Sequence, residues 1–273
     1  MFHRRWATAL LTVLALLGLG VPLAAAAPGP GVLVVSYEPA KTAADRAEQR
    51  FLQENEVLES AAAHANALIG LPHDVPLVAL SCGEANAFWI PKEKGIVFCY
   101  ELAGKYRGLF DKLNTEGTAA QQARATDDDV IGISNSVVFH EFGHALIDLY
   151  DLPATGREED AADQLATLML AGDSVHQEYA VSAIEAWGAL AAATEKGEVP
   201  EDPAGEHSLD SQRYYNAICW LYGSDPQAYQ GVVRTDANPD GVLPESRAER
   251  CPSEFEQIDK AWSRLLEPYL KQA

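Results

Sequence analysis

The sequence predicts an α+β fold in which a small N-terminal sheet packs on helices. Segments with strand character, rich in β-branched and aromatic residues, are found before residue 103. Beyond that point apolar residues recur at helical spacing, most clearly from Val130 to Tyr150. Because strands come first and helices later, the order favours α+β over a doubly wound sheet.

The first hundred residues should contain four strands and one helix. The strands are expected over Gly31–Tyr37 and Val75–Ser81, with two more in Asn86–Leu102 around a Pro/Lys/Gly turn. Residues 41–70 have the pattern of one long helix, which a glycine and a proline end.

The remainder of the chain should be helical. The polar stretch Asn114–Asp129 lacks apolar periodicity, so we expect a surface loop or a helix that ends early. A helix over Val130–Tyr150 is followed by a Pro/Gly break and by another helix that begins near Arg157. Further helices are expected near residues 175–194, 209–222 and 253–270.

Residues 1–26 have the order of a secretory signal peptide. Arg4 and Arg5 precede an apolar run, and Ala24–Ala26 offer a cleavage site. A membrane anchor is the alternative, since the run is nearly long enough to span a bilayer, but the small residues favour removal. We therefore expect a secreted or periplasmic protein, free of the membrane after cleavage, whose residues 27–273 form a single domain.

The chain is strongly acidic. Without residues 1–26 it has 18 Lys and Arg against 40 Asp and Glu, a formal net charge of −22. Such a surface repels nucleic acid and anionic lipid, so neither is expected as a partner. We attribute the acidity mainly to solubility, and only weakly to a preference for cationic substrates.

The four cysteines contain no C-x-x-C pair, and in an oxidising compartment this favours two disulfides over a thiolate metal site. Three pairings are possible. Cys82 and Cys99 flank the predicted hairpin, whereas Cys219 and Cys251 lie together in the C-terminal third. We therefore expect Cys82–Cys99 and Cys219–Cys251 disulfides.

The stretch VVFHEFGHALIDLY places His140 and His144 four residues apart, so both rings can reach one ion from the same helix face. Glu141 can then approach a metal-bound water without being a ligand. Zinc makes that water acidic and polarises a carbonyl, while the glutamate transfers the proton to a leaving group. The alternative is two ordinary helix histidines. Gly143 favours the metal site, because glycine within a helix costs about 1 kcal/mol relative to alanine.

A catalytic zinc site needs a third protein ligand, which GREEDAAD could supply. In a helix that begins at Arg157, Glu159 and Asp163 share a face, whereas Glu158 and Asp160 point away. Glu159 could therefore bind the ion while Asp163 orients a ligand histidine. The alternative is that acids are favoured in any first helical turn by the macrodipole. The short Pro/Gly turn favours ligation, because it folds this helix back toward the first.

His140-Glu141-x-x-His144 followed by Glu159-x-x-x-Asp163 resembles the gluzincin pattern of thermolysin-like peptidases. The resemblance implies a zincin-like fold with an active-site helix. It also implies that Glu159 is the third zinc ligand and that Asp163 supports a ligand histidine.

Asn86-Ala87-Phe88-Trp89 is similar to the edge strand that binds substrate backbone in thermolysin. An extended peptide can pair with such an edge through main-chain hydrogen bonds. Asn86 and Ala87 are therefore candidate substrate-binding residues. The alternative is that Phe88 and Trp89 fill the core of a hairpin, as aromatic residues often do in strands.

Three longer stretches, GREEDAAD, HSLDSQRYYNAICWLYGSDP and LPESRAERCPSEFEQIDKAW, resemble an exported bacterial family described as metallopeptidases. This likeness covers most of residues 86–262. The spacing from His144 to Glu159 is shorter than in thermolysin, and the separate histidine segment that stabilises the transition state there has no clear counterpart by spacing. His207 is the first candidate for the oxyanion-stabilising catalytic residue, followed by Tyr150 and Tyr214. The alternative for His207 is a histidine of a surface loop.

The sequence thus predicts an exported metallopeptidase that holds one Zn²⁺ ion and hydrolyses peptides or proteins with a zinc-bound water. The alternative is a non-catalytic exported zinc-binding protein that uses the same site structurally or to bind a partner. A catalytic site lies in a cleft and keeps one coordination position open to water, whereas a fourth protein ligand closes a structural site.

Overall fold

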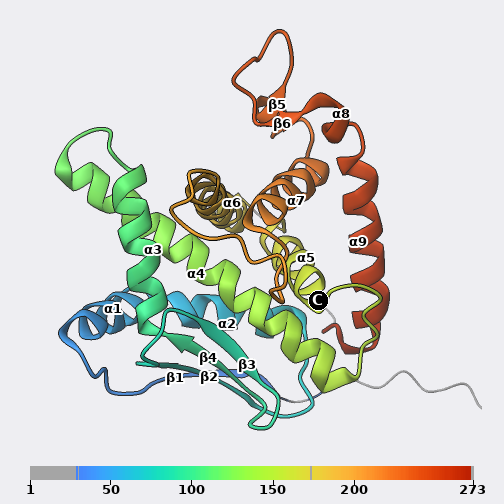
Figure 1. Cartoon of the computed structure of the whole chain (residues 1–273). Helices are drawn as coiled ribbons and strands as arrows, with labels where there is room; N and C mark the ends of the chain where they lie inside the picture. The colour runs from blue at the N-terminus through green and yellow to red at the C-terminus, as the bar shows by residue number, and fades with distance from the viewer. Residues whose placement is uncertain (1–28, 30, 173, 272–273) are drawn as a thin grey trace, which may run out of the picture.

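The computed structural model describes residues 29, 31–172 and 174–271, and the predicted signal peptide lies outside this part of the chain. Its architecture is mixed α+β, with helix α4 between a small sheet and the C-terminal helices (Figure 1). The strands of the sheet are β1 (Leu33–Tyr37), β2 (Val75–Leu80), β3 (Ala87–Ile90) and β4 (Gly95–Cys99). The helices are α1 (Ala43–Glu54), α2 (Val57–Leu68), α3 (Tyr100–Leu113), α4 (Ala119–Tyr150), α5 (Glu158–Leu170), α6 (Ser174–Glu195), α7 (Asp210–Ser224), α8 (Glu245–Ala248) and α9 (Cys251–Leu266). The short strands β5 (Val233–Arg234) and β6 (Leu243–Pro244) pair apart from the sheet.

The sheet has the order β1-β2-β4-β3, with β1, β2 and β4 parallel and β3 antiparallel at one edge. Val75, Leu77 and Ala79 alternate along β2 and are buried. Helices α2 and α4 pack together against the sheet (Figure 1). The helical segment expected between the first two strands is present as α1 and α2, which connect β1 to β2, because parallel neighbours need a crossover.

Helix α4 runs the length of the molecule and contacts the sheet on one side and α5 and α6 on the other. Gly143 lies where α4 and α5 cross. A Cβ atom at this position would come within 2.9 Å of the Ala162 Cα atom of α5. The glycine therefore lets the two backbones approach at the height of the histidine motif.

The predicted secondary structure is wrong in three regions. The long helix over residues 41–70 is broken at Glu56, which has a φ angle of 49°. Helix α3 was not predicted: its first three residues were expected to end a strand, and no element was expected over the rest of it. The stretch Asn114–Asp129 is largely the start of α4, where Thr118 and Gln121 form a capping box. The first helical turns of α4 are polar because they are largely exposed to solvent, not because their backbone is irregular.

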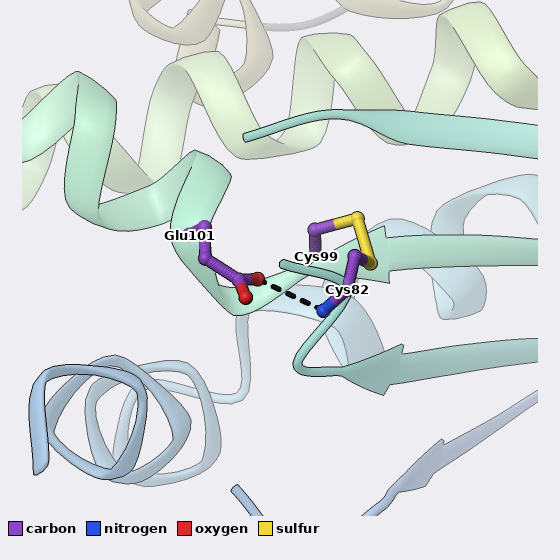
Figure 2. A group of neighbouring side chains, drawn as sticks. All are labelled: Cys82, Cys99 and Glu101. Carbon is purple, nitrogen blue, oxygen red and sulfur yellow. Dashed lines mark hydrogen bonds between the residues drawn. A yellow bond between two sulfur atoms is a disulfide. The ribbon is translucent and has the colours of Figure 1, made fainter. Parts of the chain in front are cut away.

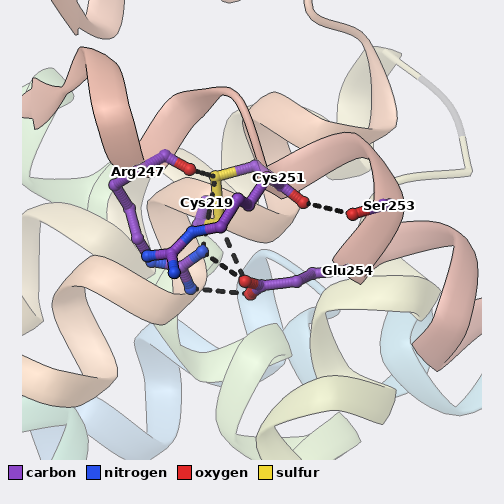
Figure 3. The surroundings of a disulfide bond; sticks show 6 residues. Cys219, Arg247, Cys251, Ser253 and Glu254 are labelled. Atoms are coloured by element: carbon purple, nitrogen blue, oxygen red, sulfur yellow. Dashed lines mark hydrogen bonds and ion pairs between the residues drawn. A yellow bond between two sulfur atoms is a disulfide. The ribbon is translucent and has the colours of Figure 1, made fainter.

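Both predicted disulfides are present. The Cys82–Cys99 bond ties the segment before β3 to the end of β4, and the Glu101 carboxylate accepts the Cys82 N–H (Figure 2). The Cys219–Cys251 bond ties α7 to α9 (Figure 3). Such bonds are typical of proteins in oxidising compartments. Within the described residues, no helix combines the length and apolar character needed to cross a membrane.

Candidate metal centre

Three side-chain atoms from α4 and α5 converge on one point. His140 Nε2 lies 3.3 Å from His144 Nε2 and 3.0 Å from Glu159 Oε2, and the latter two atoms are 3.3 Å apart. A tetrahedral zinc ion with bonds of about 2.0–2.1 Å keeps its ligands about 3.3 Å from one another. The donor set and its spacing therefore fit one zinc ion.

A carboxylate holds the other nitrogen of each ring. His140 Nδ1 lies 2.8 Å from Asp163 Oδ1, as expected for an orienting partner. His144 Nδ1 lies 2.7 Å from Glu158 Oε1, although Glu158 was expected to point away. That expectation is wrong because helical spacing fixes the direction of Cβ, whereas the long side chain of this first α5 residue reaches across to α4.

Arg213 is a site residue that the sequence analysis missed. Its Nε and Nη2 atoms donate to the two oxygens of Asp163 at 2.8 and 2.7 Å, and its side chain is only 9% exposed. The sequence pattern of α7 could have indicated that Arg213 is buried. Arg213 lies seven residues before Trp220 and eight before Leu221, on the same buried face of the helix.

Glu141 faces the exposed edge of the sheet. The Trp89 N–H of β3 donates to Glu141 Oε2 at 2.7 Å. Further along α4, Asp148 Oδ2 accepts from Trp89 Nε1 at 3.0 Å and from Lys94 Nζ at 2.7 Å. The β3–β4 hairpin is thereby fastened to α4 beside the histidines.

A cleft of about 560 Å³ brings most of the predicted site residues together. The residues that line it are Asn86, Ala87, Phe88, Trp89, Pro91, His140, Glu141, His144, Arg157, Glu158, Glu159, Glu206 and His207. Phe88 and Trp89 are partly exposed here, so neither is fully buried in a hairpin core. A carboxylate beside paired imidazoles in an open cleft can transfer protons to and from a bound ligand.

His207 reaches the same centre from the loop between α6 and α7. Its Nε2 atom lies 2.9 Å from Glu159 Oε2, and its ring stacks on His140 with 5.6 Å between centroids. Arg157 Nη1 donates to the carbonyl oxygens of residues 205, 206 and 207 at 3.0–3.1 Å. Ser208 Oγ donates to Asp160 Oδ1 at 2.6 Å. His207 is thus a loop histidine that the start of α5 holds at the centre.

The other two oxyanion candidates lie elsewhere. Tyr150 donates its hydroxyl hydrogen to the Gly70 carbonyl and stacks on Tyr269. Tyr214 lines a separate cavity next to Gly188. Neither tyrosine lines the cleft.

The centre favours positive charge. Burial opposes ionisation of Glu159, yet hydrogen bonds from His140, His144 and His207 hold its pKa below the usual range. Burial likewise lowers the pKa of His140, but hydrogen bonds to Asp163 and Glu159 outweigh it and raise the pKa to about 9. A dication could replace these protons, which again fits a metal ion.

Comparison with known proteins assigns the chain to a family. No curated protein and no solved structure shows a significant match. The model of a family described as "Putative metallopeptidase" matches residues 37–266, which include the whole centre. Since this match covers most of the chain, the protein belongs to that metallopeptidase family.

Proposed function

We propose that the protein is an exported zinc-dependent peptidase with a zincin-like fold, in which His140, His144 and Glu159 bind the ion. The observation that carries this proposal is the spacing of their three donor atoms, with Glu141 beside them in an open cleft. The family description, the two disulfides and the predicted signal peptide support peptidase chemistry in an exported protein.

Glu141 acts as the general base in this proposal. When bound, zinc would acidify a water molecule and polarise the substrate carbonyl. Glu141 accepts the proton and delivers it to the leaving amine. The Trp89 N–H holds one carboxylate oxygen at 2.7 Å, which fixes the direction of the base. Asp163 and Glu158 hold the ligand rings from behind.

The outer edge of β3 binds the substrate backbone. Ala87 and Trp89 are spaced two residues apart, and the Trp89 N–H points away from β4, toward Glu141. By the alternation of a strand, the Ala87 N–H and carbonyl also point away from β4. Because Glu141 accepts the Trp89 N–H, an extended peptide can pair with the Ala87 N–H and carbonyl and with the Trp89 carbonyl, without a sequence requirement. Asn86 lines the same cleft.

His207 stabilises the oxyanion of the transition state. It is half-exposed, with 48% of its side chain accessible, and lines the cleft opposite the hairpin. A neutral or protonated imidazole can donate a hydrogen bond to a developing oxyanion.

Cleavage of a proteome-derived peptide library tests the proposal. Zinc-loaded residues 27–273 should cleave peptides, and a chelator should abolish cleavage until zinc is restored. Absence of cleavage by protein that holds one zinc ion would contradict catalysis.

A second candidate function is structural or partner-binding use of the same ion. The contact of His207 Nε2 with Glu159 Oε2 favours it, because His207 could close the site as a fourth ligand. X-ray absorption of the zinc-loaded protein separates the candidates: a catalytic site should show two imidazoles and a water, and His207→Ala should not change the imidazole count. A closed site should show three imidazoles, and the variant should show two.

A further inference from the structure

Arg213 occupies a buried position between two helices of the C-terminal half. Its guanidinium carbon lies 3.7 Å from the centroid of the Trp187 ring of α6. On the other side, its Nε and Nη2 atoms bind both oxygens of Asp163 on α5. The side chains are 9% and 17% exposed, so water competes little for these bonds.

The two bonds determine which way the carboxylate faces. A carboxylate alone rotates over a broad range about its last torsion. The planar fork of an arginine fixes both oxygens at once, which a lysine cannot do. Asp163 Oδ1 also lies 2.8 Å from His140 Nδ1. Because a carboxylate paired with arginine only accepts hydrogen bonds, His140 Nδ1 must donate. Nε2, which donates to Glu159 Oε2 at 3.0 Å, is then the nitrogen that can give up its proton and bind an ion.

We propose that Arg213 is a positioning residue of the metal centre, which acts on zinc through Asp163 and His140. It fixes the tautomer and the ring orientation of His140, so that Nε2 meets the ion without rearrangement. The inference rests on the proposed function only in taking His140 as a zinc ligand. It adds a role for α7, which supplies no predicted ligand.

A second arginine, partly buried with 25% of its side chain exposed, provides a control. Arg107 on α3 binds both oxygens of Glu48 on α1 at 2.9 and 3.2 Å, and its guanidinium carbon lies 4.3 Å from the centroid of the Phe51 ring. Arg107 thus makes the same paired bonds to a carboxylate and the same kind of ring contact as Arg213, and its Nη1 atom also donates to Asp127 Oδ1 at 2.6 Å. Its carboxylate partners do not hold His140 or His144. A purely structural role predicts the same outcome for both arginines.

Zinc affinity, measured by competition with a chromophoric chelator, separates the roles. Arg213→Lys should weaken zinc binding about 10-fold or more, the effect seen when the partner of a ligand histidine is disturbed. Arg107→Lys should lower the melting temperature but leave the zinc affinity of the folded protein unchanged. Equal affinity in Arg213→Lys and wild type, or equal losses in both variants, would overturn the inference.

A double-mutant cycle tests the route through Asp163. If Arg213 acts through that carboxylate, Arg213→Lys should not weaken zinc binding further once Asp163→Asn is in place. If Arg213→Lys weakened zinc binding as much in the Asp163→Asn protein as in the wild type, the inference would be overturned. Failure of the wild-type protein to bind zinc would instead remove the proposed function.

Nitrogen-15 NMR of the zinc-loaded wild type requires no variant and keeps the inference testable if the substitutions prevent folding. His140 should carry its proton on Nδ1, with Nε2 bound to the ion. Coordination through Nδ1 would overturn the inference.

Discussion

The two walls of the cleft contact different side chains of α4. The hairpin wall, β3 and β4, binds the Glu141 carboxylate through the Trp89 N–H. The helix wall, the start of α5 with residues 205–208, supplies the carboxylates beside His140 and His144. The hairpin wall therefore positions the proposed base, Glu141, whereas the helix wall positions the proposed ligands His140 and His144. We therefore predict that metal content and hydrolysis can be disturbed separately.

The largest effect is expected in the helix wall, from Glu159→Ala. Loss of the Glu159 carboxylate, which lies within 3.3 Å of both Nε2 atoms, should leave the purified protein largely zinc-free, as measured by metal analysis. Asp160→Ala is the control, because Asp160 contacts Ser208 and not the histidines. If zinc survives in Glu159→Ala but is lost in Asp163→Ala, an aspartate is the third ligand and the gluzincin assignment is wrong.

The next largest effect is expected at Glu141 of α4, which the hairpin wall holds through the Trp89 N–H. Glu141→Gln should keep zinc content and the circular dichroism spectrum but lower peptide hydrolysis by about 10² to 10⁴, the usual contribution of a positioned base. The amide can still accept the Trp89 N–H through its oxygen, so the local structure should persist. Undiminished hydrolysis in this variant would show that another group accepts the proton.

The parts of the site that lie on one helix could be predicted from sequence. His140 and His144 share a face of α4 because they are four residues apart, and the same rule paired Glu159 with Asp163 on α5. The two pairs come together because a short turn folds α5 back onto α4. Gly143 indicated where the two helices make contact.

The remaining contacts depend on how separate helices pack. Arg213 and the loop of His207 reach the centre because α7 packs on α5 and α6, which no local pattern encodes. Arg157 was expected only to begin a helix, yet it binds three carbonyl oxygens some 50 residues away in the chain. The polar start of α4 was expected to be a surface loop or a helix that ends early. Apolar periodicity reports burial on one face of a helix, and the first turns of α4 are largely exposed.

A smaller effect on hydrolysis is expected from the anchor of the hairpin wall. Asp148→Ala removes the acceptor of Trp89 Nε1 and Lys94 Nζ, so β3 should be held less firmly against α4. Hydrolysis should fall roughly 2- to 10-fold, the equivalent of about one hydrogen bond, while zinc content stays unchanged. Asp111→Ala, at an exposed position of α3, is the control. Loss of zinc in Asp148→Ala would mean that the two walls are not independent.

The smallest effect is expected at the exposed partner of the second imidazole. Glu158 holds His144 Nδ1 as Asp163 holds His140 Nδ1, but its side chain is 48% exposed and that of Asp163 is 17% exposed. Asp163→Asn should weaken zinc binding about 10- to 100-fold. Glu158→Gln should weaken it less than about 5-fold, because exposed charged pairs contribute at most about 1 kcal/mol. Chelator competition at low and high salt measures both. The Glu158 effect should shrink with salt while the buried Asp163 effect persists, since salt screens exposed charges more strongly than buried ones. Equal losses in the two variants would show that burial does not set the strength of these contacts.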